Sequence, residues 1–237
     1  MWKHLINTTD YTTFELVTFG IGCYMWAIVY GFVIYDIFKY KRADIPVLAV
    51  CGNVAWEFYW GLIYKTNMGP ILQWSYMIWF FLDLLIVYGA FRYGAKQEPV
   101  VAARKYNTFI MISVIAAWMV IFRFFIPRFD DNIGAFTGWI LNTIMSIGFV
   151  LQKMRQPEFG TNRLVAVCKF LGTGLCNFVC FSSPSLNWNK TLLSLCIIFA
   201  IFDLIYIYLV FTGPKTVTTL TATSQPQLVA ERAPVVI

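Results

Sequence analysis

The sequence predicts an all-α protein that crosses a membrane with seven transmembrane helices, and three observations lead to this fold class. Hydrophobic residues make up 59% of the 237-residue chain and charged residues only 13%, whereas a soluble domain has about 25% charged residues. Apolar windows of about 20 residues, the length that crosses a bilayer, recur along the chain. The segments between them are short and contain turn-forming residues, so no soluble domain fits between the expected helices.

The first three windows predict helices at 14–38, 45–64 and 71–92. A short basic segment separates the first from the second. The turn sequence Asn67-Met68-Gly69-Pro70 separates the second from the third, because Gly and Pro end one helix and begin the next.

The last four windows predict helices at 108–126, 135–152, 164–183 and 191–212, of which the first two are the shortest. Residues 1–212 are therefore expected to form one transmembrane domain. The remaining segment, 213–237, is rich in Thr, Pro and Val, and we expect it to be a disordered cytosolic tail.

Lys and Arg residues gather on one side of the predicted helices. Twelve lie in 39–44, 92–107, 153–163 and the tail, and five lie in the N-terminal segment and the loops of the other side. Positively charged loops stay in the cytosol, so the N-terminus is expected in the lumen and the tail in the cytosol. The net charge of +6 therefore reports topology and does not indicate nucleic-acid binding. Glycosylation sequons at Asn7 and Asn189 fall on the expected lumenal side.

A faint internal similarity is compatible with a 3+1+3 parallel repeat. Segment 79–84 of the third expected helix resembles 200–204 of the seventh, and 48–51 of the second resembles 165–168 of the sixth. Helices one to three and five to seven would then be two copies around a linking fourth helix.

Three acidic residues lie deep inside predicted helices: Glu57 in the second, Asp83 in the third and Asp203 in the seventh. A carboxylate at such a depth costs about 2.5–3.5 kcal/mol, so three of them on separate helices indicate a shared polar interior. Burial favours the protonated form of a carboxyl group, which is the form that a general acid needs. The alternative is that the three residues only join helices through hydrogen bonds.

Aromatic side chains share helix faces with these acids. Side chains three and four residues apart lie on one face of a helix, and the electron-rich face of an aromatic ring attracts cations. An acid among such rings could deliver a proton and then stabilise a carbocation. The residues expected to contact the substrate or the cation are Asn53, Trp56, Trp60, Tyr64, Tyr76, Trp79 and Tyr206.

One basic residue, Lys169, falls inside the sixth predicted helix. It lies near the cytosolic end, and we expect its side chain to extend to the membrane surface. A pair with a buried Asp inside the bundle is the alternative.

The segment Gly52-Asn53-Val54-Ala55-Trp56-Glu57-Phe58-Tyr59-Trp60-Gly61-Leu62-Ile63-Tyr64 resembles the small membrane-integral terpene cyclases of fungal meroterpenoid and indole-diterpene biosynthesis. The likeness continues through 79–92, 164–172 and 199–206, and so follows the helices in order. The Asn-x-x-Trp-Glu core is the most specific part. The tail has no counterpart.

The resemblance implies an acid-initiated terpene cyclase, an enzyme of the isomerase or lyase type. It would protonate a terminal epoxide or an alkene of a prenyl chain attached to a polyketide or an indole, and guide the chain into fused rings. The acidic pair of the family corresponds to Glu57 and Asp203, with Asp83 as a third candidate. The resemblance also implies a role in secondary metabolism and a location in the membrane of the endoplasmic reticulum.

We expect neither a metal ion nor another cofactor. The sequence Asp130-Asp131-Asn132-Ile133-Gly134 lacks the third acid of a magnesium-binding Asp-Asp-x-x-Asp motif, and no Asp-x-Asp-Asp motif occurs. These are the motifs of soluble terpene cyclases, so direct protonation by a buried carboxyl group is the remaining way to start the reaction.

Two other functions fit the same composition. A small seven-helix transporter would use the buried carboxyl groups to bind protons or substrate, although no Pro lies in the middle of a predicted helix to break it. A non-catalytic receptor or assembly subunit is the other alternative, but the short loops offer little surface for a ligand.

Overall fold

The computed structural model describes residues 5–95, 101–158, 160, 162–182 and 190–213. The expected tail at 214–237 and the sequon at Asn189 lie outside these residues. Within the described part of the chain, all regular structure is helical, which confirms the all-α fold class.

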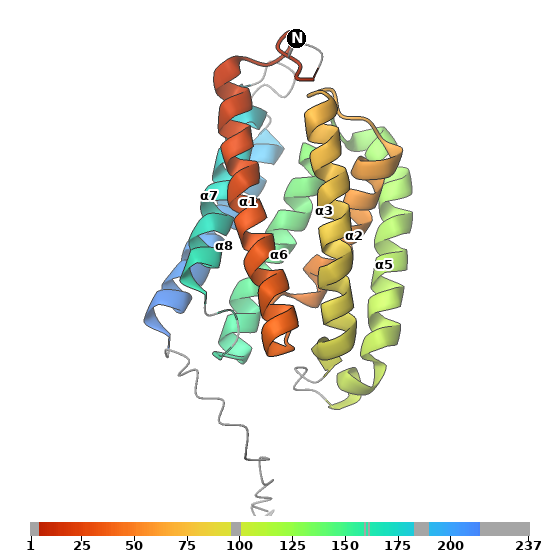
Figure 1. The fold of residues 1–237 in the computed structure, drawn as a ribbon, viewed down its shortest axis with the longest axis vertical. Coiled ribbons are helices and arrows are strands. Elements are labelled where there is room, and N and C mark those ends of the chain that lie inside the picture. Colours follow the sequence, from red (N-terminus) through yellow and green to blue (C-terminus); the bar gives the residue numbers. More distant parts are fainter. Residues whose placement is uncertain (1–4, 96–100, 159, 161, 183–189, 214–237) are drawn as a thin grey trace, which may run out of the picture.

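Seven helical segments follow one another along the chain and match the seven expected spans in order (Figure 1). The second and third end in a turn of π-helix, η2 and η3. The largest difference is in the fourth span, which is longer at both ends than the window predicted. The bounds are α1 (Thr13–Tyr40), α2 (Val47–Phe58) with η2 (Tyr59–Ile63), α3 (Pro70–Gly89) with η3 (Ala90–Gly94), α5 (Val101–Phe129), α6 (Ala135–Arg155), α7 (Arg163–Ser182) and α8 (Lys190–Thr212).

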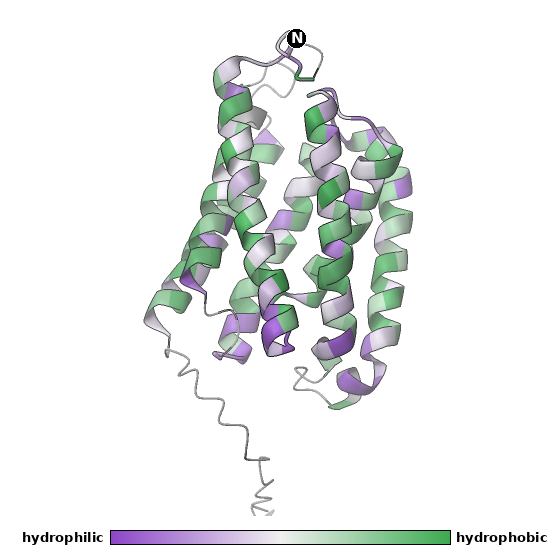
Figure 2. Cartoon of the chain, viewed as in Figure 1, coloured by the Kyte–Doolittle hydropathy of each residue, from purple (hydrophilic) through white to green (hydrophobic). Residues whose placement is uncertain are grey.

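The outer surface of the bundle is apolar, as expected of an integral membrane protein. Among the residues that the structure describes, five helices are long and apolar enough to cross a membrane, namely α1, α3 with η3, α5, α6 and α8, and α2 with η2 is a shorter apolar helix. Phe109 and Phe124 of α5 are 71% and 72% exposed, which suits contact with lipid. Figure 2 shows hydrophilic residues gathered at the two ends of the bundle, with mostly hydrophobic residues between them.

Local signals set the helix ends. At the start of α1 the Thr12 hydroxyl accepts a hydrogen bond from the backbone N–H of Glu15 at 3.3 Å, and the Glu15 carboxylate accepts from the backbone N–H of Thr12 at 2.7 Å, a capping box. Pro46 precedes α2 and Pro70 is the first residue of α3, where the missing N–H has no helical partner to lose.

The helices enclose a central space. Helix α1 packs on α7 and on α3, α3 packs on α2, α2 packs on α6, and α6 packs on α8, which returns to α7. Helix α5 packs on the outside of α2 (Figure 1). The candidate site lies inside this ring.

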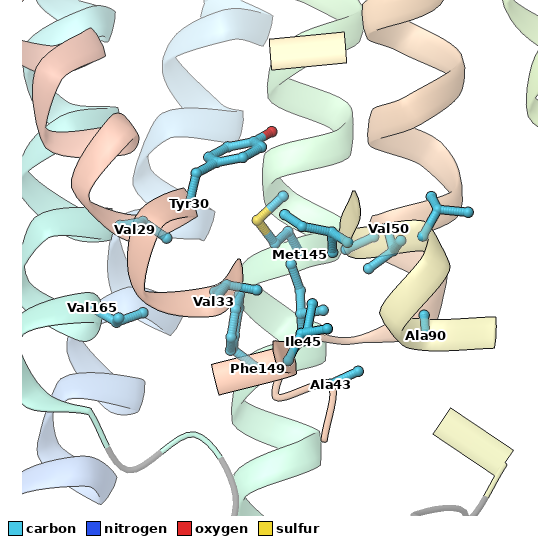
Figure 3. Close-up of a cluster of buried hydrophobic side chains, with 14 of the residues drawn as sticks. Val29, Tyr30, Val33, Ala43, Ile45, Val50, Ala90, Met145, Phe149 and Val165 are labelled. Carbon is cyan, nitrogen blue, oxygen red and sulfur yellow. The ribbon is translucent and has the colours of Figure 1, made fainter. Parts of the chain in front are cut away.

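An apolar cluster fills the end of the ring away from the N-terminus. Figure 3 shows Val33, Ile45, Val50 and Phe149 of this cluster, with Tyr30 at its edge and the Tyr30 hydroxyl pointing away from it. The one polar group of Tyr30 is thus directed toward the middle of the bundle.

Helices α1 and α7 approach closely because small residues face each other where they cross. A Cβ atom on Gly22 would lie 2.8 Å from the carbonyl oxygen of Gly172 and 2.9 Å from the backbone nitrogen of Cys176. Such contacts with backbone atoms cannot be relieved by turning a side chain, so this crossing needs glycine.

Gly22→Ala is therefore expected to destabilise the protein by about 1–3 kcal/mol, the usual cost of overpacking. The thermal unfolding midpoint of the purified protein measures this effect. Gly20→Ala is the matched control, since it adds the same methyl group to the same helix and a Cβ there meets nothing within 4 Å. Equal midpoints for the two variants would show that α1 and α7 are not in close contact.

The 3+1+3 parallel repeat remains a prediction. The order of the helices agrees with it, because α5 follows α1–α3 and precedes α6–α8 along the chain and packs outside the ring. The helix order alone does not establish a repeat.

Candidate active site

A cavity with an empty volume of about 860 Å³ lies inside the ring between α1, α2, α3, α6 and α7. Most of its wall is apolar, and seven aromatic side chains line it: Phe19, Trp26, Tyr30, Trp56, Tyr76, Trp79 and Trp139. Polar groups reach it at only a few points, so an apolar substrate with few polar atoms would fit.

Glu57 of α2 is the acidic residue in the wall of this cavity. Its side chain is buried, and its Oε1 atom accepts a hydrogen bond from the Tyr30 hydroxyl at 2.9 Å. Its Oε2 atom is buried and has no hydrogen-bond partner among the described residues. A protonated Glu57 would therefore accept from Tyr30 with one oxygen and carry its proton on the other.

Asp83 of α3 lies behind Glu57. It is 2% exposed, interacts with both Glu57 and Tyr30, and does not line the cavity. Two adjacent carboxyl groups in a low-dielectric interior resist ionising together, so the Glu57–Asp83 pair is suited to keep at least one proton. The prediction that the three buried acids share one polar interior agrees with this placement for Glu57 and Asp83, but it is wrong for Asp203, which pairs with Lys169 outside the cavity wall.

The turn of π-helix after Glu57 is fixed by α3. The Gln73 amide nitrogen donates to the carbonyl oxygens of Trp60 at 2.7 Å, Gly61 at 3.0 Å and Tyr64 at 3.2 Å. These carbonyls at the end of the helix would otherwise lack partners. A π-bulge is frequent at functional sites, and here it comes directly after the acidic residue.

Asp203 lies elsewhere. It forms a salt bridge with Lys169 of α7 at 2.5 Å, and Lys169 also donates to the Ser146 hydroxyl at 2.7 Å. Both charged side chains are almost completely buried, and neither lines the cavity. The expectation that Lys169 extends to the membrane surface is therefore wrong, and the alternative of an internal pair with Asp is confirmed.

The structure separates the residues that were expected to contact the substrate or the cation into two groups. Asn53, Trp56, Tyr76 and Trp79 line the cavity. Trp60 and Tyr64 pack against each other beyond it, and the Tyr206 hydroxyl donates to the carbonyl of Gly160 at 3.1 Å in a loop after α6. The sequence could not show which part of a helix face meets the cavity.

Several cavity residues were not predicted. Trp26 and Tyr30 come from α1, and Trp139 and Asn142 from α6. Phe19, Cys23, Trp26 and Tyr30 are spaced by three and four residues, so their spacing was a usable signal. This spacing is a weak signal in a helix that is apolar on all sides, because no polar face indicates which side of the helix faces the interior.

Hydrogen bonds anchor the Trp56 ring in the cavity wall. Its indole nitrogen donates to the Thr137 hydroxyl at 2.7 Å, and that hydroxyl donates to the Asp130 carboxylate. Asp130 also accepts from the backbone N–H of Phe136 at 3.0 Å at the start of α6. Asp130, just before α6, thus holds both a helix end and a ring of the site.

This arrangement makes stability depend on pH. The pKa of Asp130 is raised to about 6, mainly by burial and secondly by the negative charge of the neighbouring Asp131. Because the folded state binds this proton more tightly than the unfolded chain, where an Asp has a pKa of about 3.9, stability is highest at acid pH. It falls as the pH rises from about 4 to about 6.

Asp130→Asn is expected to reduce this fall in the unfolding midpoint between pH 4 and pH 7. Part of the fall will remain, because burial also raises the pKa of Asp44 to about 6. Asp10→Asn is the control, an exposed acid outside the site. A pH profile of Asp130→Asn identical to that of the wild type would contradict the assignment.

Among the described residues, no three His, Cys, Asp or Glu side chains gather in a group that could hold a metal ion. The acids in and behind the cavity wall are the pair Glu57 and Asp83.

Comparison with known proteins gives one family. The model of the Pyr4-like transmembrane terpene cyclases matches residues 7–213. The Pyr4-family terpene cyclase mfmH of Annulohypoxylon moriforme is 28% identical over 136 residues, 55% of this chain and 54% of that protein. Terpene cyclase macJ of Penicillium terrestre is 26% identical over 160 residues, 65% of this chain and 61% of that protein.

A third relative, asnovolin H synthase nvfL of Aspergillus novofumigatus, is 27% identical over 99 residues, 40% of each chain. The matches cover less than two thirds of the length of each of these relatives. No solved structure matches the chain.

Proposed function

This chain belongs to the Pyr4-like transmembrane terpene cyclases, and from that premise we propose that it cyclises an epoxidised prenyl chain by donating a proton from Glu57. The prenyl chain of the substrate would be attached to a polyketide or an indole. One observation carries the proposal: among the described residues that line the cavity, Glu57 is the acid, and Tyr30 holds only one of its two carboxyl oxygens.

The first step is a proton transfer. Oε2–H of Glu57 protonates the epoxide oxygen, the bond from that oxygen to the more substituted carbon breaks, and the oxygen becomes a hydroxyl group. The π electrons of the nearest alkene form a bond to that carbon and leave a new cation further along the chain. The same step repeats until a C–H proton is lost to a base. Substrate and product are therefore isomers, and the proton count is unchanged.

Asp83 and Tyr30 support the acid. The Tyr30 hydroxyl donates to the Oε1 atom of Glu57 at 2.9 Å, which leaves Oε2 as the oxygen that carries the proton. Asp83 interacts with both residues behind the wall, and its carboxyl group is placed to return a proton to Glu57 between turnovers.

The aromatic wall then stabilises the cation. Trp56 contacts Tyr76 at a ring-centroid distance of 5.3 Å, and Tyr76 contacts Trp79 at 6.0 Å. A cation over such rings gains about 0.5–2 kcal/mol from each face. Asn53 lies in the same wall and offers the cavity an amide.

Asp203 has another role in this proposal. Its carboxylate is paired with the Lys169 amine and does not line the cavity. The pair lies beside the cavity, since the Lys169 amine is 6.0 Å from the ring of the cavity residue Trp26, and we assign it to holding α6, α7 and α8 together. The acidic role that the resemblance implies for Asp203 is tested in the Discussion.

Two further parts of the proposal concern location. The apolar surface and the family place the chain in a membrane. The distribution of Lys and Arg supports a lumenal N-terminus, and we propose the endoplasmic reticulum as the membrane. Asn7 is on the proposed lumenal side, although its amide nitrogen already donates to Asp10 and to the carbonyl of Asn67.

The purified protein, in detergent and without any ion gradient, is expected to convert an epoxyfarnesylated phenol into a ring-containing isomer of the same mass with a new hydroxyl group. Mass spectrometry and NMR of the product check this. Uptake of the compound into sealed vesicles without conversion would instead support a carrier and overturn the proposal.

A further inference from the structure

Two buried amides in the cavity wall lack hydrogen-bond partners. Asn142 of α6 is 7% exposed, and neither its Oδ1 nor its Nδ2 atom has a partner among the described residues. Asn177 of α7 is 6% exposed, and its Oδ1 atom has none within the same part of the chain. Both residues line the cavity. A buried polar group without a partner is rare, so three such atoms in one cavity point to a ligand.

The two amides come from neighbouring turns of the same wall. Lys169 bonds to Ser146 across α6 and α7, and this contact sets the register of the two helices. Asn142 is four residues from Ser146, and Asn177 is eight residues from Lys169, which correspond to about 6 Å and about 12 Å along the helices. Because α6 and α7 run in opposite directions, both displacements point toward the N-terminal end of the bundle.

Glu57 is on a different wall of the same cavity, on α2. The aromatic residues Trp56, Tyr76 and Trp79 are also on α2 and α3. Glu57 thus lies on α2, and the two amides without partners lie on α6 and α7, which are other helices of the same cavity wall.

We propose that Asn142 and Asn177 form a subsite for the polar head group that carries the prenyl chain. Asn142 offers a free acceptor and a free donor on one amide, so it fits a head group with a hydrogen-bond donor and an acceptor side by side, such as a carboxamide, a lactam or a carboxylic acid. The Asn177 oxygen accepts a second N–H or O–H. This subsite rests on the proposed function and narrows its substrate class.

Such a subsite fixes the orientation of the substrate. In this proposal the head group lies on α6 and α7, and the far end of the prenyl chain lies at Glu57 and the rings of α2 and α3. A substrate bound the other way would leave both amides unpaired, and a buried polar group without a partner is unfavourable. The amides therefore favour the one orientation in which the epoxide meets the acid.

Three probes test the subsite from the ligand side. Each carries the same epoxidised farnesyl chain on a benzene ring, and the opposite ring position bears a carboxamide, a methyl ester or an ethyl group. The carboxamide is a donor and an acceptor, the ester is only an acceptor, and the ethyl group is neither. The wild type is expected to show a KM at least about 10-fold lower for the carboxamide than for the ethyl probe, with the ester between them.

Substitutions test it from the protein side. Asn142→Leu is expected to raise KM for the carboxamide to the value for the ethyl probe, with kcat and the ethyl probe unaffected, because a contact equal in the ground state and the transition state changes only KM. Asn177→Leu is expected to have a smaller effect in the same direction. Ile140→Leu, on α6 but outside the cavity wall, is the control and should treat all three probes as the wild type does.

The outcomes separate this subsite from the proposed function. Equal KM values of the wild type for all three probes, with ring formation intact, would overturn the subsite and leave the cyclase. Tryptophan fluorescence quenching measures binding without turnover, so tighter binding of the carboxamide probe without ring formation would support the subsite and overturn the cyclase. If Asn142→Leu does not fold, the comparison of the three probes on the wild type still decides.

Discussion

Glu57→Gln is expected to lower the rate of ring formation by at least about 100-fold, and by up to about 10,000-fold, the range that a general acid contributes. Glutamine has the size of glutamic acid, and its carbonyl can still accept the hydrogen bond from Tyr30. It cannot supply a proton to the epoxide. The initial rate with an epoxidised prenyl substrate, under equal loading of folded protein, measures the effect.

Asp83→Asn is the matched control, because it removes the other carboxyl group of the same cluster. Asp83 does not line the cavity, so the variant is expected to keep slow ring formation, with a changed pH profile because Glu57 then titrates alone. The proposal is wrong if Glu57→Gln keeps its rate while Asp83→Asn loses it.

Lys169→Met is expected to destabilise the protein by about 3–5 kcal/mol, the usual cost of leaving one partner of a buried ion pair alone. Asp203 is 1% exposed, and without Lys169 its carboxylate would have no compensating charge. The free energy of unfolding in a mild detergent measures the loss. Lys190→Met removes an exposed lysine at the start of α8, and its effect is expected to stay within about 0.5 kcal/mol.

The double variant Lys169→Met/Asp203→Leu is expected to recover most of this stability, because two apolar side chains can replace a buried ion pair. It also tests the acidic role of Asp203. Ring formation by the refolded double variant would assign Asp203 to structure, and a stable but inactive double variant would assign it to the chemistry. Unchanged stability of Lys169→Met alone would contradict the buried pair.

The helices were predictable from the sequence because bilayer thickness sets their length. Each expected span has its helix, and local chemistry explains the ends, such as Pro70 at the first residue of α3. The fourth window was too short because Arg104, Lys105 and Arg128 interrupt the apolar run. A helix in water can continue through such residues, so α5 begins at Val101 and ends at Phe129.

The site was only partly predictable. Glu57 and Asp83 stand out as carboxyl groups in apolar helices, and the rings near Glu57 follow from helical spacing. Sequence spacing does not show how a helix is turned toward its neighbours. The side chain of Tyr206 was therefore expected to contact the substrate, but it lies outside the cavity wall. The sequence also could not show which group Lys169 contacts, because a lysine near a helix end can extend to the surface or pair inside the bundle. The packing of α6 and α8 around it determines which of the two occurs.

The most direct measurement of the central claim is an experimental structure with a substrate analogue that carries the terminal epoxide on a fully saturated chain. Such a chain cannot form rings, because it has no alkenes to attack the opened epoxide. The epoxide oxygen is expected within about 2.6–3.2 Å of the Oε2 atom of Glu57, the reach of a general acid. An epoxide bound beside Asp203, or in the lipid outside the ring of helices, would contradict it.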